Sequence, residues 1–225
     1  MYNGLIKRLC RRGCDSAHQN KRERIMQNNT PENLILLCGE LLEATSDSYF
    51  KNDTEYVEFS MKIILPTGTD ILPVAIPKHL VDDTVVQGAV ISVTGTLVSE
   101  ETFVEDEQTL SIKVLVSEVY AGETEITSGV FLTGNILKKP YSYPIKDTMR
   151  AEFEITVGSH NALSRVPVSA VGECASIAES LQLGDPVSLL GQLHSYEYFD
   201  ISGEQSVTKT GYEVEVLTFT ALPKI

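Results

Sequence analysis

The sequence has no tryptophan, and its four histidines, His18, His79, His160 and His194, stand far apart in the chain. It contains neither a Walker-type phosphate loop nor a dinucleotide glycine fingerprint, and no serine stands in a nucleophile elbow. Catalysis needs reactive groups that are held together in a defined geometry. We therefore expect a protein that is not an enzyme and that uses no cofactor.

Long apolar runs and clustered cysteines are also missing. No run approaches the roughly 20 residues that span a bilayer, and the N-terminal MYNGLIKRLCRRGC lacks the apolar segment and cleavage site of a secretory signal. The four cysteines are too scattered for a disulfide framework, and Cys38 and Cys174 lie in apolar patterns, where a free thiol packs as a small hydrophobe. We expect a soluble cytoplasmic protein with no membrane partner.

Charge is distributed unevenly along the chain, whose formal net charge is -13. Residues 1–30 hold seven basic and two acidic side chains, a net charge of +5. Residues 31–127 hold four basic and eighteen acidic side chains, a net charge of -14, and residues 128–225 hold seven and eleven, a net charge of -4. The first half should repel a polyanion, whereas the second half should repel it only weakly.

The basic segment, residues 1–30, is predicted to be disordered. The pattern Cys-x3-Cys-x3-His over residues 10–18 resembles half of a zinc site, but a structural zinc needs about four ligands and no fourth stands nearby, so we expect no metal. The tail could instead reach nucleic acid or fold back on the acidic half. Residues 21–24 can be written with purine-only codons, as a translated ribosome-binding site would be, and we hypothesise that Met26 is the natural start. A native peptide that begins upstream of Met26 would exclude this.

An internal repeat is the most informative feature of the sequence. Three segments recur with offsets of 94 to 96 residues, which is too long for a solenoid unit, so each copy is predicted to be a small domain. The two domains are placed at residues 31–122 and 128–225. The matched segments are NLILLCGELLEA (33–44) with GVFLTGNILKKP (129–140), ILPVAIPKHL (71–80) with RVPVSAVGEC (165–174), and GAVISVTGTLVS (88–99) with GDPVSLLGQLHS (184–195).

Period-two alternation and β-branched residues predict five strands in each copy, with one short helix after the third. This order is typical of an OB-fold, so the predicted fold class is all-β, with two tandem OB-fold (five-stranded Greek-key) barrels. Gly95 and Gly191, in the fourth strands, suit the bend of a small barrel. The strands are expected near residues 34–46, 55–65, 70–76, 88–101 and 108–120, and again near 129–138, 149–158, 164–171, 186–199 and 208–220.

The helices are expected near residues 77–86 in the first copy and in GECASIAESLQLGD in the second. The second helix is predicted to end at Gly184 with a positive φ. Its apolar face is predicted to comprise Ala175, Ile177, Ala178, Leu181 and Leu183.

VFLTGNILKKP, VPVSAVG, AESLQLGDPVSLLGQLHSYEY and GYEVEV resemble the bacterial single-stranded DNA-binding protein family, particularly its tandem OB-fold members in Clostridia-like bacteria. The resemblance covers residues 130–219 and, with the first copy in register, residues 33–220. It implies single-stranded DNA held on the barrel by aromatic stacking and by Lys/Arg pairing with phosphates. It also implies a role in DNA replication, recombination or repair, with proteins of those processes as partners, and a homo-oligomer.

The sequence departs from the family at several ligand positions. Where the family carries Trp-Gly-Arg after the third strand, this chain has Val171-Gly172-Glu173, and in the fourth strand it has Leu190-Gly191-Gln192. A basic position that follows is Tyr196. An alternative is therefore a degenerate tandem OB-fold module that binds a protein partner and has little affinity for DNA.

Candidate nucleic-acid-binding residues all lie in the second copy. Alternation in the fourth strand would put His194, Tyr196 and Tyr198 on one face as a stacking stripe, or as surface or dimer-contact aromatics. LKKPYSYP (137–144) is interpreted as a loop, either solvated or in contact with phosphates. The basic candidates are Lys138, Lys139, Lys146, Arg150, Arg165 and Lys209, and the aromatic candidates are Tyr141, Tyr143, Phe153, Tyr196 and Tyr198.

Overall fold

The computed structural model describes residues 33–44, 48–104, 107–122, 128–159, 162–200 and 207–223. The predictions for residues 1–30, including the cysteine and histidine pattern and the start at Met26, lie outside these residues. No helix in the described part of the chain is long and apolar enough to cross a membrane.

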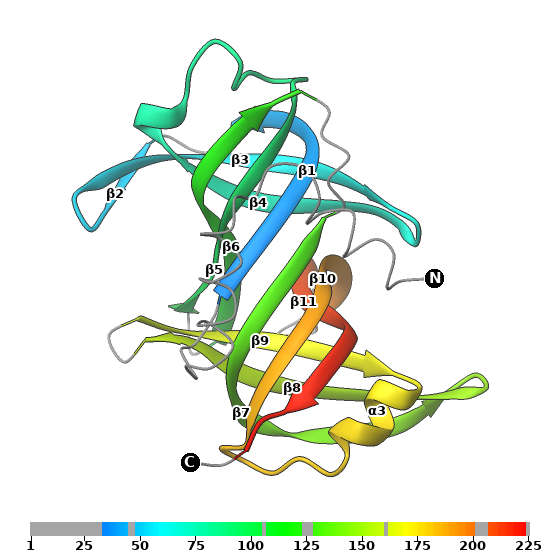
Figure 1. The fold of residues 1–225 in the computed structure, drawn as a ribbon. Helices are drawn as coiled ribbons and strands as arrows, with labels where there is room; N and C mark the ends of the chain where they lie inside the picture. Colours follow the sequence, from blue (N-terminus) through cyan, green and yellow to red (C-terminus); the bar gives the residue numbers. More distant parts are fainter. Residues whose placement is uncertain are drawn as a thin grey trace, which may run out of the picture. The chain divides into compact units, whose positions relative to one another are not determined.

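Five strands of the first copy close into a barrel (Figure 1). The strands pair in the order β1, β3, β4, β6, β5 and back to β1, and every pair is antiparallel except β4 with β6. A short strand, β2, extends the sheet beyond β3. The bounds are β1 Asn33–Ala44, β2 Tyr49–Lys51, β3 Thr54–Leu65, β4 Gly68–Pro77, β5 Val90–Val104 and β6 Glu107–Ala121.

The second copy closes in the same way. Its strands pair in the order β7, β8, β9, β11, β10 and back to β7, and only β9 and β11 are parallel. A short helix, α3, lies between β9 and β10, so the predicted class of two OB-fold barrels is confirmed. The bounds are β7 Gly129–Ile145, β8 Thr148–Ser159, β9 Ala162–Val171, α3 Glu173–Ala178, β10 Pro186–Asp200 and β11 Val207–Ala221.

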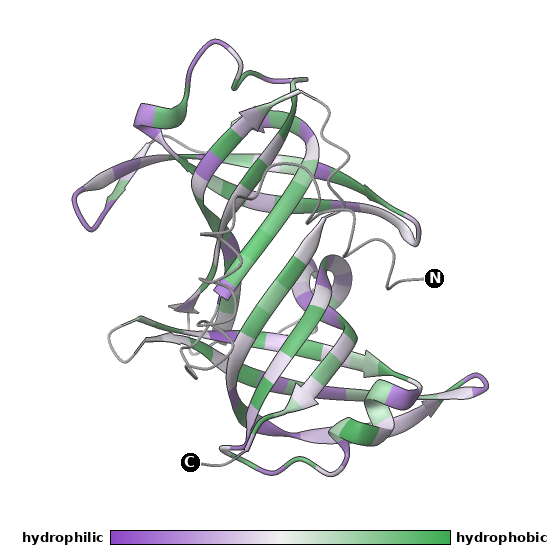
Figure 2. Cartoon of the chain, in the orientation of Figure 1, coloured by the Kyte–Doolittle hydropathy of each residue, from purple (hydrophilic) through white to green (hydrophobic). Residues whose placement is uncertain are grey.

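Alternating side chains fill each barrel, and the same alternation is visible along the strands in Figure 2. In β1, Ile35 and Leu37 are buried, whereas Leu34 before them is exposed and Leu36 between them is only partly buried. Val187 and Leu189 are buried in the same way in β10. Each such side chain contributes about 1.5 to 3 kcal/mol when it is fully buried. At the bends of the fourth strands, where the ladder shifts register, a Cβ on Gly95 or Gly191 would collide with the backbone of the neighbouring strand.

The two barrels are joined by antiparallel pairing of β1 with β7. Ile35 lies opposite Val130, which is its own counterpart in the repeat, 95 residues later. A residue paired with its own counterpart marks a local twofold relation between the two copies. One sheet therefore runs continuously through β6, β5, β1, β7, β10 and β11.

The helical predictions are only partly correct. In the first copy the expected helix near 77–86 is a single 3-10 turn, Lys78–Leu80. Asp82 accepts hydrogen bonds from the backbone and the hydroxyl of Thr84, and such a local side-chain turn competes with a helix. In the second copy, α3 has only six residues.

The predicted apolar face of α3 is also too wide. Ala175, Ala178 and Leu181 are buried, but Ile177 is exposed because it lies on the side of α3 opposite Ala175, and Leu183 is exposed beyond the end of the helix. The positive φ of Gly184, 81°, agrees with the predicted end of this segment.

The interpretation of LKKPYSYP as a loop is wrong. This segment continues β7, where Tyr141 pairs with Glu152 and Tyr143 pairs with Arg150. Two register shifts, on either side of Lys138, accommodate the interruption by proline. Proline is tolerated in such irregular strands because its missing N–H costs no ladder hydrogen bond there. The two strands of this hairpin, β7 and β8, therefore hold their side chains in a fixed register.

Candidate nucleic-acid interface

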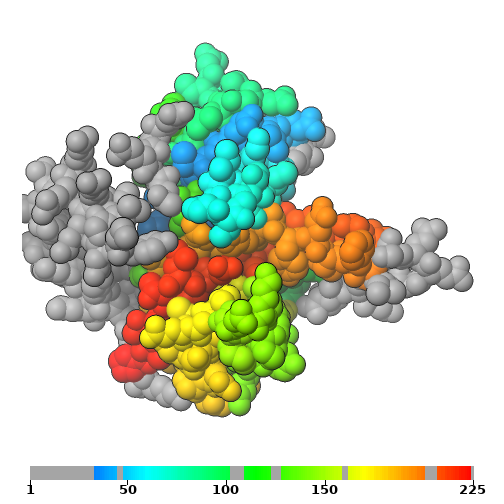
Figure 3. Space-filling view, turned by 90° about the vertical axis from the view of Figure 1, so that its right-hand side faces the viewer, coloured from blue at the N-terminus to red at the C-terminus, as the bar shows by residue number. Residues whose placement is uncertain are grey.

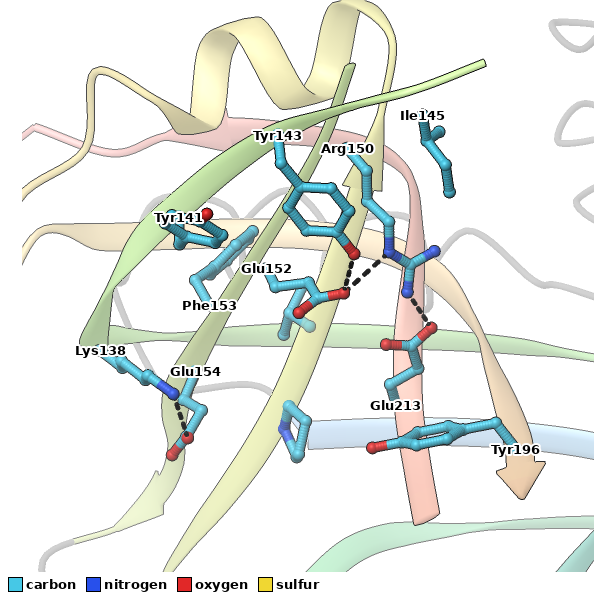
Figure 4. Close-up of a pocket in the computed structure, with 12 residues that line it drawn as sticks. Lys138, Tyr141, Tyr143, Ile145, Arg150, Glu152, Phe153, Glu154, Tyr196 and Glu213 are labelled. Atoms are coloured by element: carbon cyan, nitrogen blue, oxygen red, sulfur yellow. Dashed lines mark hydrogen bonds and ion pairs between the residues drawn. The ribbon is translucent and has the colours of Figure 1, made fainter. Parts of the chain in front are cut away.

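A pocket of about 960 Å³ lies on one face of the second barrel, between the β7–β8 hairpin and the outer part of β10 and β11 (Figure 4). We call it the tyrosine groove, because three tyrosines line it together with charged and apolar side chains. Its lining consists of Lys138, Tyr141, Tyr143, Ile145, Arg150, Glu152, Phe153, Glu154, Pro167, Val168, Tyr196 and Glu213.

Two of the tyrosines stand together on β7. The ring centroids of Tyr141 and Tyr143 are 5.7 Å apart, with 33° between the ring planes, and Tyr141 is 68% exposed. Tyr196 faces them from β10 and is 45% exposed (Figure 4). Exposed rings on both sides of a groove are the arrangement that bases use for stacking.

Tyr196 is held in place by the strand beside it. It pairs with Gly211 of β11, and a Cβ on Gly211 would lie 2.5 Å from the Tyr196 ring. The ring therefore packs over Gly211, in space that the side chain of any other residue would occupy. Burial, together with the charge of Glu213, raises the pKa of the Tyr196 phenol.

The floor of the tyrosine groove is a chain of ion pairs around Arg150. Its guanidinium donates to Glu213 at 2.6 Å and to Glu152 at 3.1 Å, and Glu152 also accepts the hydroxyl hydrogen of Tyr143 at 2.5 Å. Partial burial acts to lower the pKa of Arg150, but the hydrogen bond and charge of Glu213 outweigh it and raise that pKa. The hydrogen bond to Glu152 raises the pKa of Tyr143. Arg150 is thus paired with two carboxylates of the groove and is not a free phosphate ligand.

The other basic candidates divide into two groups. Arg165 pairs with Glu154 at 2.7 Å and with Glu101 of the first barrel, and Lys209 pairs with Asp200. Neither lines the groove. These two cations are therefore already neutralised.

Three lysines remain accessible. Lys138 lines the groove and makes only a long, exposed contact with Glu154, 3.8 Å. Lys139 and Lys146 are exposed and make no ion pair with any residue that the structure describes. These three lysines are the cations best placed to meet a phosphate.

Not every aromatic candidate offers an accessible ring in the groove. Phe153 is only 3% exposed and its ring contacts Phe219 in the barrel core, so the prediction that it offers a stacking face is wrong. Tyr198 lies beside Tyr196, with ring centroids 6.1 Å apart, but beyond the groove. His194 does not join a stacking stripe, because its ring is engaged by Asp70 of the first barrel.

The corresponding face of the first barrel carries ion pairs. Glu100 stands where the second barrel has Tyr196, and Lys113 stands where it has Glu213. Lys113 pairs with Glu58 at 3.0 Å and lies 4.9 Å from the centre of the Tyr49 ring. Lys113 and Glu100, 3.7 Å apart, thus form an ion pair at the positions that correspond to Glu213 and Tyr196.

Several residues of the site were not predicted from the sequence. Glu152, Glu154 and Glu213 supply the carboxylates of the groove, and Ile145 supplies an apolar wall. Glu152 and Glu154 alternate along β8, which places them on the same outer face. Glu213 could have been found only by assigning the register of β11 against β10.

No protein-family model and no curated protein matches this chain. Solved structures do. The wild-type single-stranded DNA binding protein from Thermus aquaticus is 18% identical, with a TM-score of 0.65 over 87% of this chain and 95% of that one. A deletion mutant of the same protein gives a TM-score of 0.67 at 18% identity, over 88% and 98% of the two chains. At this identity the similarity establishes a shared fold, an arrangement of two OB-fold barrels in one chain.

Proposed function

We propose that this protein binds single-stranded DNA without catalysis, mainly through the tyrosine groove of the second barrel, and acts in DNA replication, recombination or repair. The observation that carries the proposal is the position of Tyr141, Tyr143 and Tyr196 on facing sides of one groove. Bases stack on these rings, and the phosphates pair with Lys138 in the groove and with Lys139 and Lys146 on the β7–β8 hairpin. The structural similarity to the single-stranded DNA binding protein of Thermus aquaticus supports the same class of ligand.

Titration with oligo(dT) at low and at high salt tests this proposal. Binding is expected at low salt, where the electrostatic contribution is largest, and is expected to weaken as salt rises. Tyr196→Ala should lower the affinity by about 5- to 150-fold, since one stacked base contributes roughly 1 to 3 kcal/mol. Phe199→Ala is the matched control, because this ring is 73% exposed on the same strand but does not line the groove. Absence of binding at low salt would refute the proposal.

A second candidate is a protein-interaction module with little affinity for DNA. The lining of the groove favours it in one respect, because it holds two basic side chains, Lys138 and Arg150, against three glutamates. Aromatic rings beside carboxylates attract a cationic side chain of a partner protein. A basic peptide that binds the full chain and is not displaced by oligo(dT) would favour this candidate over the first.

We also propose that the chain forms a homo-oligomer through the outer face of the continuous sheet. Leu34, Leu36, Cys38, Phe131 and Leu190 alternate there with the buried residues of β1, β7 and β10, and they carry no charge. The local twofold relation of the two barrels makes this face suited to a second copy. Leu34→Glu should lower the mass measured by sedimentation, and an unchanged mass would exclude this interface.

A further inference from the structure

Two equivalent sets of hydrogen bonds connect the barrels outside the β1–β7 pairing. In one, the Ser99 N–H donates to the Ser164 hydroxyl at 3.2 Å, and the Arg165 N–H donates to the Ser99 hydroxyl at 2.7 Å. In the other, the Ser195 N–H donates to the Asp70 carboxylate at 2.7 Å. Ser195 is the counterpart of Ser99 in the repeat, and Asp70 is the counterpart of Ser164.

The two contacts differ in strength at one position. Asp70 is 5% exposed and accepts three hydrogen bonds, from the backbone and hydroxyl of Ser195 and from Nδ1 of His194, at 2.7, 3.0 and 3.0 Å. Hydrogen bonds to an ionised group are about twice as strong as neutral ones. A buried carboxylate is costly unless such donors surround it. The contact between β4 and β10 therefore depends more strongly on its hydrogen bonds than the contact at Ser164 does.

This contact lies next to a wall of the tyrosine groove. His194 and Ser195 directly precede Tyr196 on β10, and His194 shares a face of the strand with Tyr196. In Figure 3 the cyan β3–β4 hairpin of the first barrel lies against the orange β10 strand, which projects beyond the barrel body. The equivalent contact at Ser164 holds β5, which contributes no residue to the groove.

We propose that Asp70, on the first barrel, is a positioning residue for the tyrosine groove of the second barrel. By fixing Ser195 and His194, it sets the position of β10 and thereby of the Tyr196 ring. The first barrel, whose equivalent face carries the Lys113–Glu100 ion pair, then contributes to the groove through this contact. The inference rests on the proposed function only in that the groove is taken to bind DNA.

Hydrogen exchange of the full chain without DNA tests the positioning by itself. Asp70→Ala should speed amide exchange in residues 195–198 about tenfold or more, which corresponds to the loss of a hydrogen bond to a charged group. Ser164→Ala is the matched control, since it removes the equivalent contact and should speed exchange near Ser99 while leaving residues 195–198 unchanged. Equal exchange of residues 195–198 in Asp70→Ala and wild type would overturn the proposal.

Asp70→Ser provides a rescue variant that also guards against misfolding of Asp70→Ala. A hydroxyl already serves this position in the other contact, so Asp70→Ser should keep Ser195 protected and lose only the bond to His194. Oligo(dT) affinity should fall about tenfold in Asp70→Ala, recover largely in Asp70→Ser and stay unchanged in Ser164→Ala. If the wild type does not bind DNA, the proposed function fails while the exchange result still decides on Asp70. Equal loss of affinity in Asp70→Ala and Ser164→Ala would refute a specific positioning role.

Discussion

The carboxylate of Asp70, in the first barrel, accepts the backbone N–H of Ser195, in the second, at 2.7 Å. These residues are separated by 125 positions in the sequence. The contact joins β4 of the first repeat to β10 of the second, the strand that carries Tyr196 on one side of the tyrosine groove. The two copies are thus joined into one structural unit.

Gly211 should be essential for the shape of the tyrosine groove. Gly211→Ala would place a Cβ against the Tyr196 ring, at 2.5 Å from its nearest atom, so the ring must move. We expect weaker oligo(dT) binding together with a changed near-ultraviolet circular dichroism of tyrosine, but little change in thermal stability. Gly129→Ala is a control for the loss of a glycine, since the atom nearest to the added Cβ, the carbonyl oxygen of Gly191, lies 3.9 Å away. Wild-type affinity in Gly211→Ala would show that the ring position does not matter.

The salt dependence of binding should separate free cations from paired ones. Each phosphate neutralised on a single strand contributes about 0.7 to the slope of log K against log salt. Lys139→Ala should therefore lower this slope by about 0.7, whereas Lys209→Ala should leave it unchanged because Lys209 is paired with Asp200. The measurement is an oligo(dT) titration at several salt concentrations. An effect of Lys209→Ala as large as that of Lys139→Ala would place the DNA outside the groove.

Tyr143 and Tyr196 should ionise at a higher pH than an ordinary tyrosine. The pKa of Tyr143 is raised above 10.0 by the hydrogen bond to Glu152, and the pKa of Tyr196 is raised by burial. Between the ordinary and the raised pKa the unfolded chain loses these protons while the folded chain keeps them. The contribution to stability is thus fully present below pH 10.0 and is lost as pH rises through the raised values. Ultraviolet titration should show a late transition that Tyr143→Phe diminishes, and ionisation of every tyrosine at its ordinary pKa would contradict this assignment.

The ion pairs of Lys113 on the first barrel should matter for stability and not for DNA binding. Lys113→Met leaves Glu58 without the ammonium that lies 3.0 Å away, in a site where both side chains are largely buried. We expect the free energy of unfolding to fall by about 1 to 3 kcal/mol, with oligo(dT) affinity unchanged. Denaturant unfolding measures the change. Lys62→Met is the control: its pair with Glu40 is exposed, at 3.5 Å, and should contribute less than about 1 kcal/mol.

The sequence predicted the barrels well because strand alternation is a local signal. Ile35 and Leu37 point inward in β1, as their spacing indicates, and the repeat places their counterparts in β7. The extension of β7 through Tyr141 and Tyr143 was missed because proline argues against a strand, and the compensating register shifts leave no mark in the sequence.

The site was predicted less completely than the fold. Arg150 and Arg165 were interpreted as phosphate ligands from their charge alone. Their partners Glu213 and Glu101 lie 63 and 64 residues away, so only the folded chain shows that the cations are already paired. The position of Asp70 against Ser195 likewise depends on how the two barrels pack, which the pattern of a single strand does not encode.

Photochemical cross-linking of oligonucleotides that carry a halogenated uracil, followed by mass spectrometry, tests the central claim most directly. The reactive base joins covalently to an aromatic ring on which it stacks, so the modified residue identifies the binding face. We expect adducts at Tyr141, Tyr143 or Tyr196 that disappear in the corresponding alanine variants. Adducts confined to the first barrel, at Tyr49 or Tyr56, or no adduct at low salt, would contradict binding in the tyrosine groove.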